Sequence, residues 1–185
     1  MSGMFRECEN ITKLNLSKLK TDNTTDMSNM FGYCNILEEL DASNFKTDNV
    51  TNMFQMFSLC HQLKKLNLSN FRTNNVVNMG SMFFECSQLE ELNVSNFNSD
   101  KVKYMNSMFS YCKKLENLDI TSFNFNENLL TNIDNMFIGC SEKLKQSIRN
   151  QKLKLDKKLS KKKQSSKKKG SKKKMKKKKI NKITT

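Results

Sequence analysis

Apolar residues recur along residues 1–140 with a constant period of 26. The pattern is clearest in three columns, which hold a cysteine, a Met-Phe pair and a leucine. The cysteines are Cys8, Cys34, Cys60, Cys86, Cys112 and Cys140, and only the last spacing, of 28, departs from the period. The pairs are Met4-Phe5, Met30-Phe31, Met56-Phe57, Met82-Phe83, Met108-Phe109 and Met136-Phe137, and the leucines are Leu14, Leu40, Leu66, Leu92 and Leu118. A fixed period of this length is typical of a repeat array, in which neighbouring units stack.

The first half of each unit predicts a short strand. In the unit that begins at residues 37–45, Leu40 and Ala42 alternate with the polar Glu39 and Asp41. This period of two places alternate side chains on opposite faces of a strand. Residues 46–49 are polar and predict a turn. Strands of successive units are expected to form a parallel sheet with their leucines facing inward.

The second half of each unit predicts a short helix. The apolar residues of one unit lie at i, i+3, i+4 and i+7, which is one face of a two-turn helix, and they are Met53, Met56, Phe57 and Cys60. Thr51 or Asn52 is suited to cap this helix. Stacking is then expected to align like residues into ladders, namely Leu40, Leu66, Leu92 and Leu118, and Phe45, Phe71, Phe97 and Phe123 with Leu19 at the start.

Residues 63–86 resemble one unit of the BspA-type leucine-rich repeats, L-x-x-L-D-L-S-N-F-x-T-x-N-V-T-N-M-x-x-M-F-x-x-C. The resemblance covers about residues 1–140. It implies an α/β repeat solenoid, a leucine-rich-repeat right-handed coil of about five repeats, with one short parallel strand and one short helix per 26-residue repeat. It further implies a relation to surface proteins of bacteria and protists, some of which act in adhesion, and it brings no catalytic residues with it.

Both ends of the array depart from the regular unit. The fifth unit has a two-residue insertion near Phe125–Asn128, with Ile133 in the methionine column. Met1 aligns with Met27, so the chain begins in mid-unit without a cap. We expect a fragment, a mis-started reading frame, or an end that stacks on a partner, with end-to-end self-association as one form. The predicted domains are a repeat array at 1–140, a capping helix at 141–159 that uses the helically spaced Leu144, Ile148, Leu155 and Leu159, and a disordered tail at 160–185.

The formal net charge of +15 belongs to the carboxyl-terminal segment. Residues 1–150 hold 15 Lys and Arg against 17 Asp and Glu, whereas residues 151–185 hold 18 Lys and one acid, Asp156. Such a segment cannot bury enough apolar surface to fold alone. It could attach nonspecifically to nucleic acid or to an anionic membrane surface, act as a nuclear signal, or only solubilise the chain. The tail lysines concerned are Lys161, Lys162, Lys163, Lys167, Lys168, Lys169, Lys172, Lys173, Lys174, Lys176, Lys177, Lys178 and Lys179.

The cysteine column favours buried, reduced thiols that act as small apolar residues. Adjacent strands lie ~5 Å apart, so disulfides between units remain an alternative. No C-x-x-C pair occurs, and the one histidine, His61, stands in a column that elsewhere holds Glu9, Asn35, Ser87 and Lys113. We therefore predict no metal site and no cofactor.

The outward strand positions form the candidate binding face. Its first two rows are Lys13, Glu39, Lys65, Glu91 and Asn117, and Asn15, Asp41, Asn67, Asn93 and Asp119. A third row holds Ser17, Ser43, Ser69, Ser95 and Thr121. Charges in the first row alternate in sign, so neighbouring strands are expected to attract. The alternative is a solvated sheet surface whose charges only set the register.

Repeats supply ladders of like residues rather than the convergent unlike groups that catalysis needs, so we predict that the chain is not an enzyme. The leading function is a protein-interaction module of unknown partner, whose lysine tail attaches nonspecifically to anionic partners. The alternatives are a BspA-like surface or adhesion protein, or a fragment of one, and a nonspecific nucleic-acid-associated protein. The absence of a signal-peptide pattern and of a membrane-spanning run favours an intracellular, reducing site, whereas the family resemblance favours the cell surface.

Overall fold

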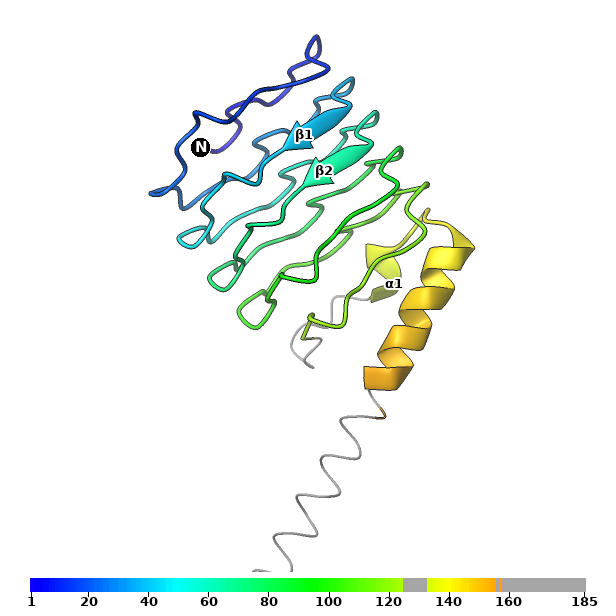
Figure 1. Ribbon diagram of the computed structural model, residues 1–185. Coiled ribbons are helices and arrows are strands. Elements are labelled where there is room, and N and C mark those ends of the chain that lie inside the picture. Colours follow the sequence, from blue (N-terminus) through cyan, green and yellow to red (C-terminus); the bar gives the residue numbers. More distant parts are fainter. Residues whose placement is uncertain (125–132, 156, 158–185) are drawn as a thin grey trace, which may run out of the picture. The chain divides into compact units, whose positions relative to one another are not determined.

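The computed structural model describes residues 1–124, 133–155 and 157, and the chain divides into compact units at Met1–Ile148 and Arg149–Thr185. Figure 1 shows the coils of the first unit side by side, from the first blue coil to the yellow-green ones. The insertion near Phe125–Asn128 and the predicted tail at 160–185 lie outside the described residues, so the predictions made for them stay predictions.

Two of the predicted strands form, and they pair as the sequence indicated. Strand β1 covers Glu39–Asp41 and strand β2 covers Lys65–Asn67. They are parallel, with Leu40 opposite Leu66, an offset of one 26-residue unit. An isolated parallel bridge joins Lys13 to Glu39 in the same register. Each unit therefore lays its Leu-x-Leu segment directly beside that of the next, so the predicted parallel register is confirmed for these units.

The prediction of one strand in every unit is wrong for the segments at 91–93 and 117–119, which have no assigned strand. Just beyond the 91–93 segment an amide side chain bridges two coils, as the amides of Asn44 and Asn70 do in the coils that carry the isolated bridge and the strands. The Asn96 amide donates to the carbonyl oxygens of Ser69 and Phe71, at 3.2 and 2.8 Å. Leu92 and Leu118 are nevertheless buried, because the inward side of the segment is the same with or without strand pairing.

The predicted helix is wrong for the coils up to Tyr111, whereas the Met-Phe segment of the last coil holds the short helix α1, Ile133–Met136. The segment around Met53 to Cys60 is a series of turns in which Gln55 and Leu59 have left-handed backbones, with φ of 54° and 62°. The N–H of Phe57 donates to Met82 O in the next unit at 2.9 Å rather than to the carbonyl four residues back. Left-handed residues cannot continue an α-helix. The apolar residues at this spacing are therefore buried by a series of turns, and the main-chain hydrogen bonds of these turns connect neighbouring coils.

The same conformation recurs in every described coil as far as Tyr111. Left-handed non-glycine residues stand at two positions per unit, and they are Glu7, Asn29, Tyr33, Gln55, Leu59, Ser81, Glu85, Ser107 and Tyr111, while Gly3 and Gly139 occupy two more of these positions. Each such non-glycine residue costs roughly 1–2 kcal/mol. The bonds between coils offset this cost, since the N–H groups of Phe31, Phe57 and Phe83 all donate to the following coil at 2.9 Å.

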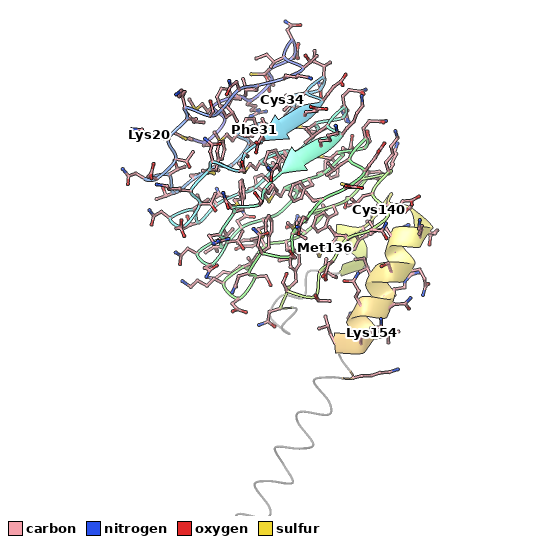
Figure 2. The ribbon with its side chains drawn as sticks, in the orientation of Figure 1. Lys20, Phe31, Cys34, Met136, Cys140 and Lys154 are labelled. Carbon is pink, nitrogen blue, oxygen red and sulfur yellow. The ribbon has the colours of Figure 1, made fainter. Side chains whose placement is uncertain are left out.

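Aromatic and sulfur-containing side chains fill the interior of the coils (Figure 2). Rings of the Met-Phe column stack with centroids 5.4–5.7 Å apart and nearly parallel planes, along Phe5, Phe31, Phe57, Phe83, Phe109 and Phe137. A second stack, Phe45, Phe71 and Phe97, has separations of 6.2 and 6.4 Å. The predicted ladders of phenylalanine are thus confirmed over these residues. Leu66 is the exception among the column leucines after the first coil, because it is only partly buried.

The array resumes beyond the insertion with a shifted register. The N–H of Phe109 donates to Met136 O at 3.1 Å, 27 residues away, whereas the equivalent bonds in earlier coils span 25. The short helix α1, Ile133–Met136, precedes this point. The two inserted residues are therefore absorbed before Met136, and the Met-Phe pair keeps its place in the core.

A helix covers residues 142–155, next to the last coil in sequence. Within the first unit, Leu144 and Ile148 are buried in its core. Ser141 accepts a hydrogen bond on its hydroxyl from the N–H of Leu144 at 3.2 Å, as an N-cap residue does. Leu159, the last residue of the predicted helical pattern, lies outside the described residues.

Candidate binding groove

A shallow groove of about 1060 Å³ runs along the strand side of the coils. Of the ten residues predicted for the binding face, all except Asn15 line it: Lys13, Glu39, Asp41, Lys65, Asn67, Glu91, Asn93, Asn117 and Asp119. The residues that line the groove belong to β1 and β2, which Figure 1 labels, and to the segments at 91–93 and 117–119. Stacking in register is what brings these residues, 26 apart in sequence, onto one surface.

The first row of this surface is connected by ion pairs. The Glu39 carboxylate lies 3.9 Å from Lys13 Nζ and 3.3 Å from Lys65 Nζ. Both lysines are largely exposed, so each pair contributes only about 0.2–1 kcal/mol. The predicted attraction between neighbouring strands is present for these three residues. The series of ion pairs ends at Lys65, because Glu91 has no ion pair with any described residue.

The side chains of the second row accept hydrogen bonds from their own local backbone. The side-chain Oδ1 of Asp41 accepts the N–H of Ser43 at 2.9 Å, two residues on. The same Asx turn recurs in every described coil, at Asn15, Asp41, Asn67, Asn93 and Asp119. One oxygen of each is therefore committed to turning the chain after the strand segment. The row still faces the groove, but it offers a partner fewer acceptors than the sequence suggested.

The aspartates of the second row remain ionised at neutral pH. The pKa of Asp119 is lowered, first by the hydroxyl of Thr121, which donates to Oδ1 at 2.6 Å, and then by the Thr121 N–H. Ser43 lowers the pKa of Asp41 in the same way. Both carboxylates are exposed, so they add negative charge to the groove rather than buried electrostatic energy.

Two charged groove residues escaped the sequence-based prediction. Lys64 and Glu90 also line the groove, one position before the predicted first row. They belong to a column of Glu38, Lys64, Glu90 and Glu116, in which Lys64 Nζ lies 3.2 Å from Glu38. The 26-residue period also aligns the residues of this column. The alternation of side chains along a strand, however, places Lys64 and Glu90 on the inner face, so they are not predicted to bind.

The cysteine column lies in the core and takes no part in the groove. Five of the six cysteines are buried, as predicted, and all six are free thiols. Each buried Sγ–H donates to the main-chain oxygen of the phenylalanine one coil back, at 3.0–3.1 Å, in the pairs Cys34–Phe5, Cys60–Phe31, Cys86–Phe57, Cys112–Phe83 and Cys140–Phe109. Burial raises the pKa of Cys86 to about 12. Burial also raises the pKa of Cys112 and Cys140, so these three thiols are protonated structural donors at neutral pH, whereas the hydrogen bond with Cys60 lowers the pKa of Cys34 to about 7.

His61 lies at the edge of the turn segment, where its Nδ1 is 3.2 Å from Glu85 O and 4.0 Å from the Glu85 carboxylate. Over the described residues there is no cluster of three or more His, Cys, Asp or Glu side chains placed to hold a metal ion. In the same part of the chain, no helix is long and apolar enough to cross a membrane. The tail lysines, Lys161 to Lys179, lie outside the described residues, so their predicted role stays a prediction.

Comparison with known proteins places the chain in one family. No curated protein and no solved structure matches it. A single family model matches three overlapping segments, residues 1–66, 26–151 and 61–177, which together span most of the chain. Overlapping matches of one model are expected for a repeat protein, in agreement with the stacked coils. The chain belongs to the family described as "Mycoplasma protein of unknown function, DUF285".

Proposed function

We propose that this chain is a BspA-like leucine-rich-repeat solenoid that serves as a non-catalytic protein-interaction module. Its binding face is the groove on the strand side. The observation that carries the proposal is the convergence of exposed polar side chains from five successive coils on one continuous groove. Three other columns support it by contrast, because the hydroxyl of Thr47, the amide of Asn96 and the thiol of Cys60 bond to neighbouring coils.

The groove is suited to modest affinity. Five strand segments about 4.8 Å apart span roughly 24 Å. A standard protein interface uses about 800 Å² per partner. The described residues that line this groove include no aromatic anchor, the type of residue that usually dominates binding energy. The proposed module therefore relies on avidity or on additional surface, such as the lysine-rich segment.

Photocrosslinking tests the location of the binding face. A photoreactive amino acid placed at Glu91 or Asn117, both exposed in the groove, should give discrete adducts with protein partners in extracts of the native host. The matched control positions are Glu9 and Asp48, which are exposed and do not line the groove. Adducts of equal yield and pattern from both sets would contradict the assignment of the groove.

We further propose that the lysine-rich segment attaches the module to anionic partners by charge alone. Binding to duplex DNA and to anionic vesicles should fall steeply with salt, since each neutralised DNA phosphate contributes a slope of about −0.9 in log K against log salt. Exchange of the thirteen lysines at 161–163, 167–169, 172–174 and 176–179 for glutamine should abolish that binding. Salt-independent binding to either target would contradict the proposal.

A further inference from the structure

The charges in the groove are unequally paired along its length. At the end formed by the first coils, Lys13 and Lys65 both lie beside Glu39. Lys64, in the same part of the groove, pairs with Glu38 at 3.2 Å. Basic and acidic side chains therefore largely satisfy one another there, and little net charge is left for a partner.

Among the described residues, the other end of the groove is lined by no lysine or arginine. Its charged residues are Glu90, Glu91 and Asp119. Glu90 lies 3.4 Å from Lys114, which is outside the lining. Glu91 has no ion pair with a described residue, and Asp119 is bonded only through one oxygen, to Thr121. The column that supplies Lys65 to the neighbouring coil holds Glu91 and then Asn117, so the alternation of charge stops at this point.

We propose that the Glu91–Asp119 end of the groove binds an extended, lysine- or arginine-containing segment of a protein partner. The inference rests on the proposed function and specifies its partner. An extended chain suits a shallow channel that crosses successive strands. The amides of Asn93 and Asn117, which also line this end, provide polar contacts for its main chain.

Other cationic ligands fit this end less well. A bound metal ion would need several converging ligands, and the described residues hold no group of three or more acidic, histidine or cysteine side chains so placed. A basic peptide needs only separated carboxylates, each of which can form an exposed ion pair with one side chain. The two carboxylates Glu91 and Asp119 meet that requirement.

The test uses the full-length chain and a fluorescent peptide of alternating lysine and serine, with a glutamine–serine peptide as the uncharged probe. Binding is followed by fluorescence anisotropy at low ionic strength. The test variant is Glu91→Gln with Asp119→Asn, and asparagine is native at the Asp119 column in three other coils, so the Asx turn is retained. The control variant, Glu9→Gln with Asp48→Asn, removes the same charge from exposed positions away from the groove.

We expect the test variant to weaken lysine-peptide binding about three- to tenfold, because it loses two exposed ion pairs with the peptide. The control variant should leave this binding unchanged. Thermal melts should be alike for the two variants. Equal weakening by both would show that only net charge matters and would overturn the inference. So would unchanged binding in the test variant, or equally tight binding of the glutamine peptide. If crosslinking at Glu91 and Asn117 still captured partners in those cases, the groove would remain the binding face and only its basic-peptide specificity would fall.

Discussion

Single buried hydroxyls connect consecutive coils. The Thr47 hydroxyl is fully buried, donates to Arg72 O at 2.9 Å and accepts the Arg72 N–H at 2.7 Å. The same two bonds recur one unit earlier, at Thr21, and one and two units later, at Thr73 and Ser99. The sequence assigns this position only to a polar turn. Its burial follows from the next coil, whose main chain supplies both partners.

Replacement of Thr47 by valine should therefore destabilise the chain by about 1–3 kcal/mol, because the Arg72 N–H and carbonyl lose their buried partner while volume is conserved. The matched control is Thr51→Val. Thr51 is exposed, and its acceptor, Thr25 O, keeps the Thr51 N–H at 2.8 Å. Urea unfolding should place the control within about 0.5 kcal/mol of the parent chain. Equal midpoints for the two variants would contradict the role of the hydroxyl column.

The thiol column has a measurable signature in pH. Because burial raises the pKa of Cys86 from its ordinary 9.0 to about 12, the folded state holds this proton more tightly than the unfolded state. Its contribution to stability is fully present below pH 9 and is lost as the pH rises from 9 to about 12. The free energy of unfolding of Cys86→Ala should fall less steeply over that interval than that of the parent chain. Parallel curves would contradict a buried, protonated thiol at Cys86.

The turn segment shows how one apolar spacing can serve two backbones. Residues at i, i+3, i+4 and i+7 are all buried in the unit at Met53, Met56, Phe57 and Cys60, as a helix would require. The chain instead turns at Gln55 and Leu59 and bonds to its neighbours. In an isolated unit these N–H groups have no acceptors on a neighbouring coil, so the local pattern favours a helix. In the stacked array the next coil supplies a carbonyl acceptor for each of them.

The two backbones predict opposite effects of glycine at position 55. In a helix, Gln55→Gly would cost about 1 kcal/mol and Gln55→Ala would be the better variant. With a φ of 54°, Gln55→Gly should be neutral or stabilising and should exceed Gln55→Ala in stability, since glycine adopts the left-handed region without strain. Thermal unfolding of the two variants decides the order. A less stable glycine variant would support the helix.

In the whole first unit, stability is a sum of interactions between neighbouring coils. Ring stacks, thiol-to-carbonyl bonds, hydroxyl bridges and main-chain bonds all connect residues about one unit apart. A repeat array of this kind is held by nearest-neighbour interfaces rather than by one central core. The groove exists only at this scale, because each coil contributes no more than a few polar side chains to it.

The 26-residue period by itself determined the stacking of the units, the register of β1 on β2, the stacks of phenylalanine and the surface on which the groove lies. These properties follow from which side chains are buried, and the periodic spacing of apolar residues predicts that burial directly. Tertiary structure alone decided the backbone of the Met-Phe segment, the burial of the Thr47 hydroxyl against the next coil, and the lack of an ion pair between Glu91 and any described residue. Each of these depends on which main-chain or side-chain group the adjacent coil presents, and a single unit does not contain that information.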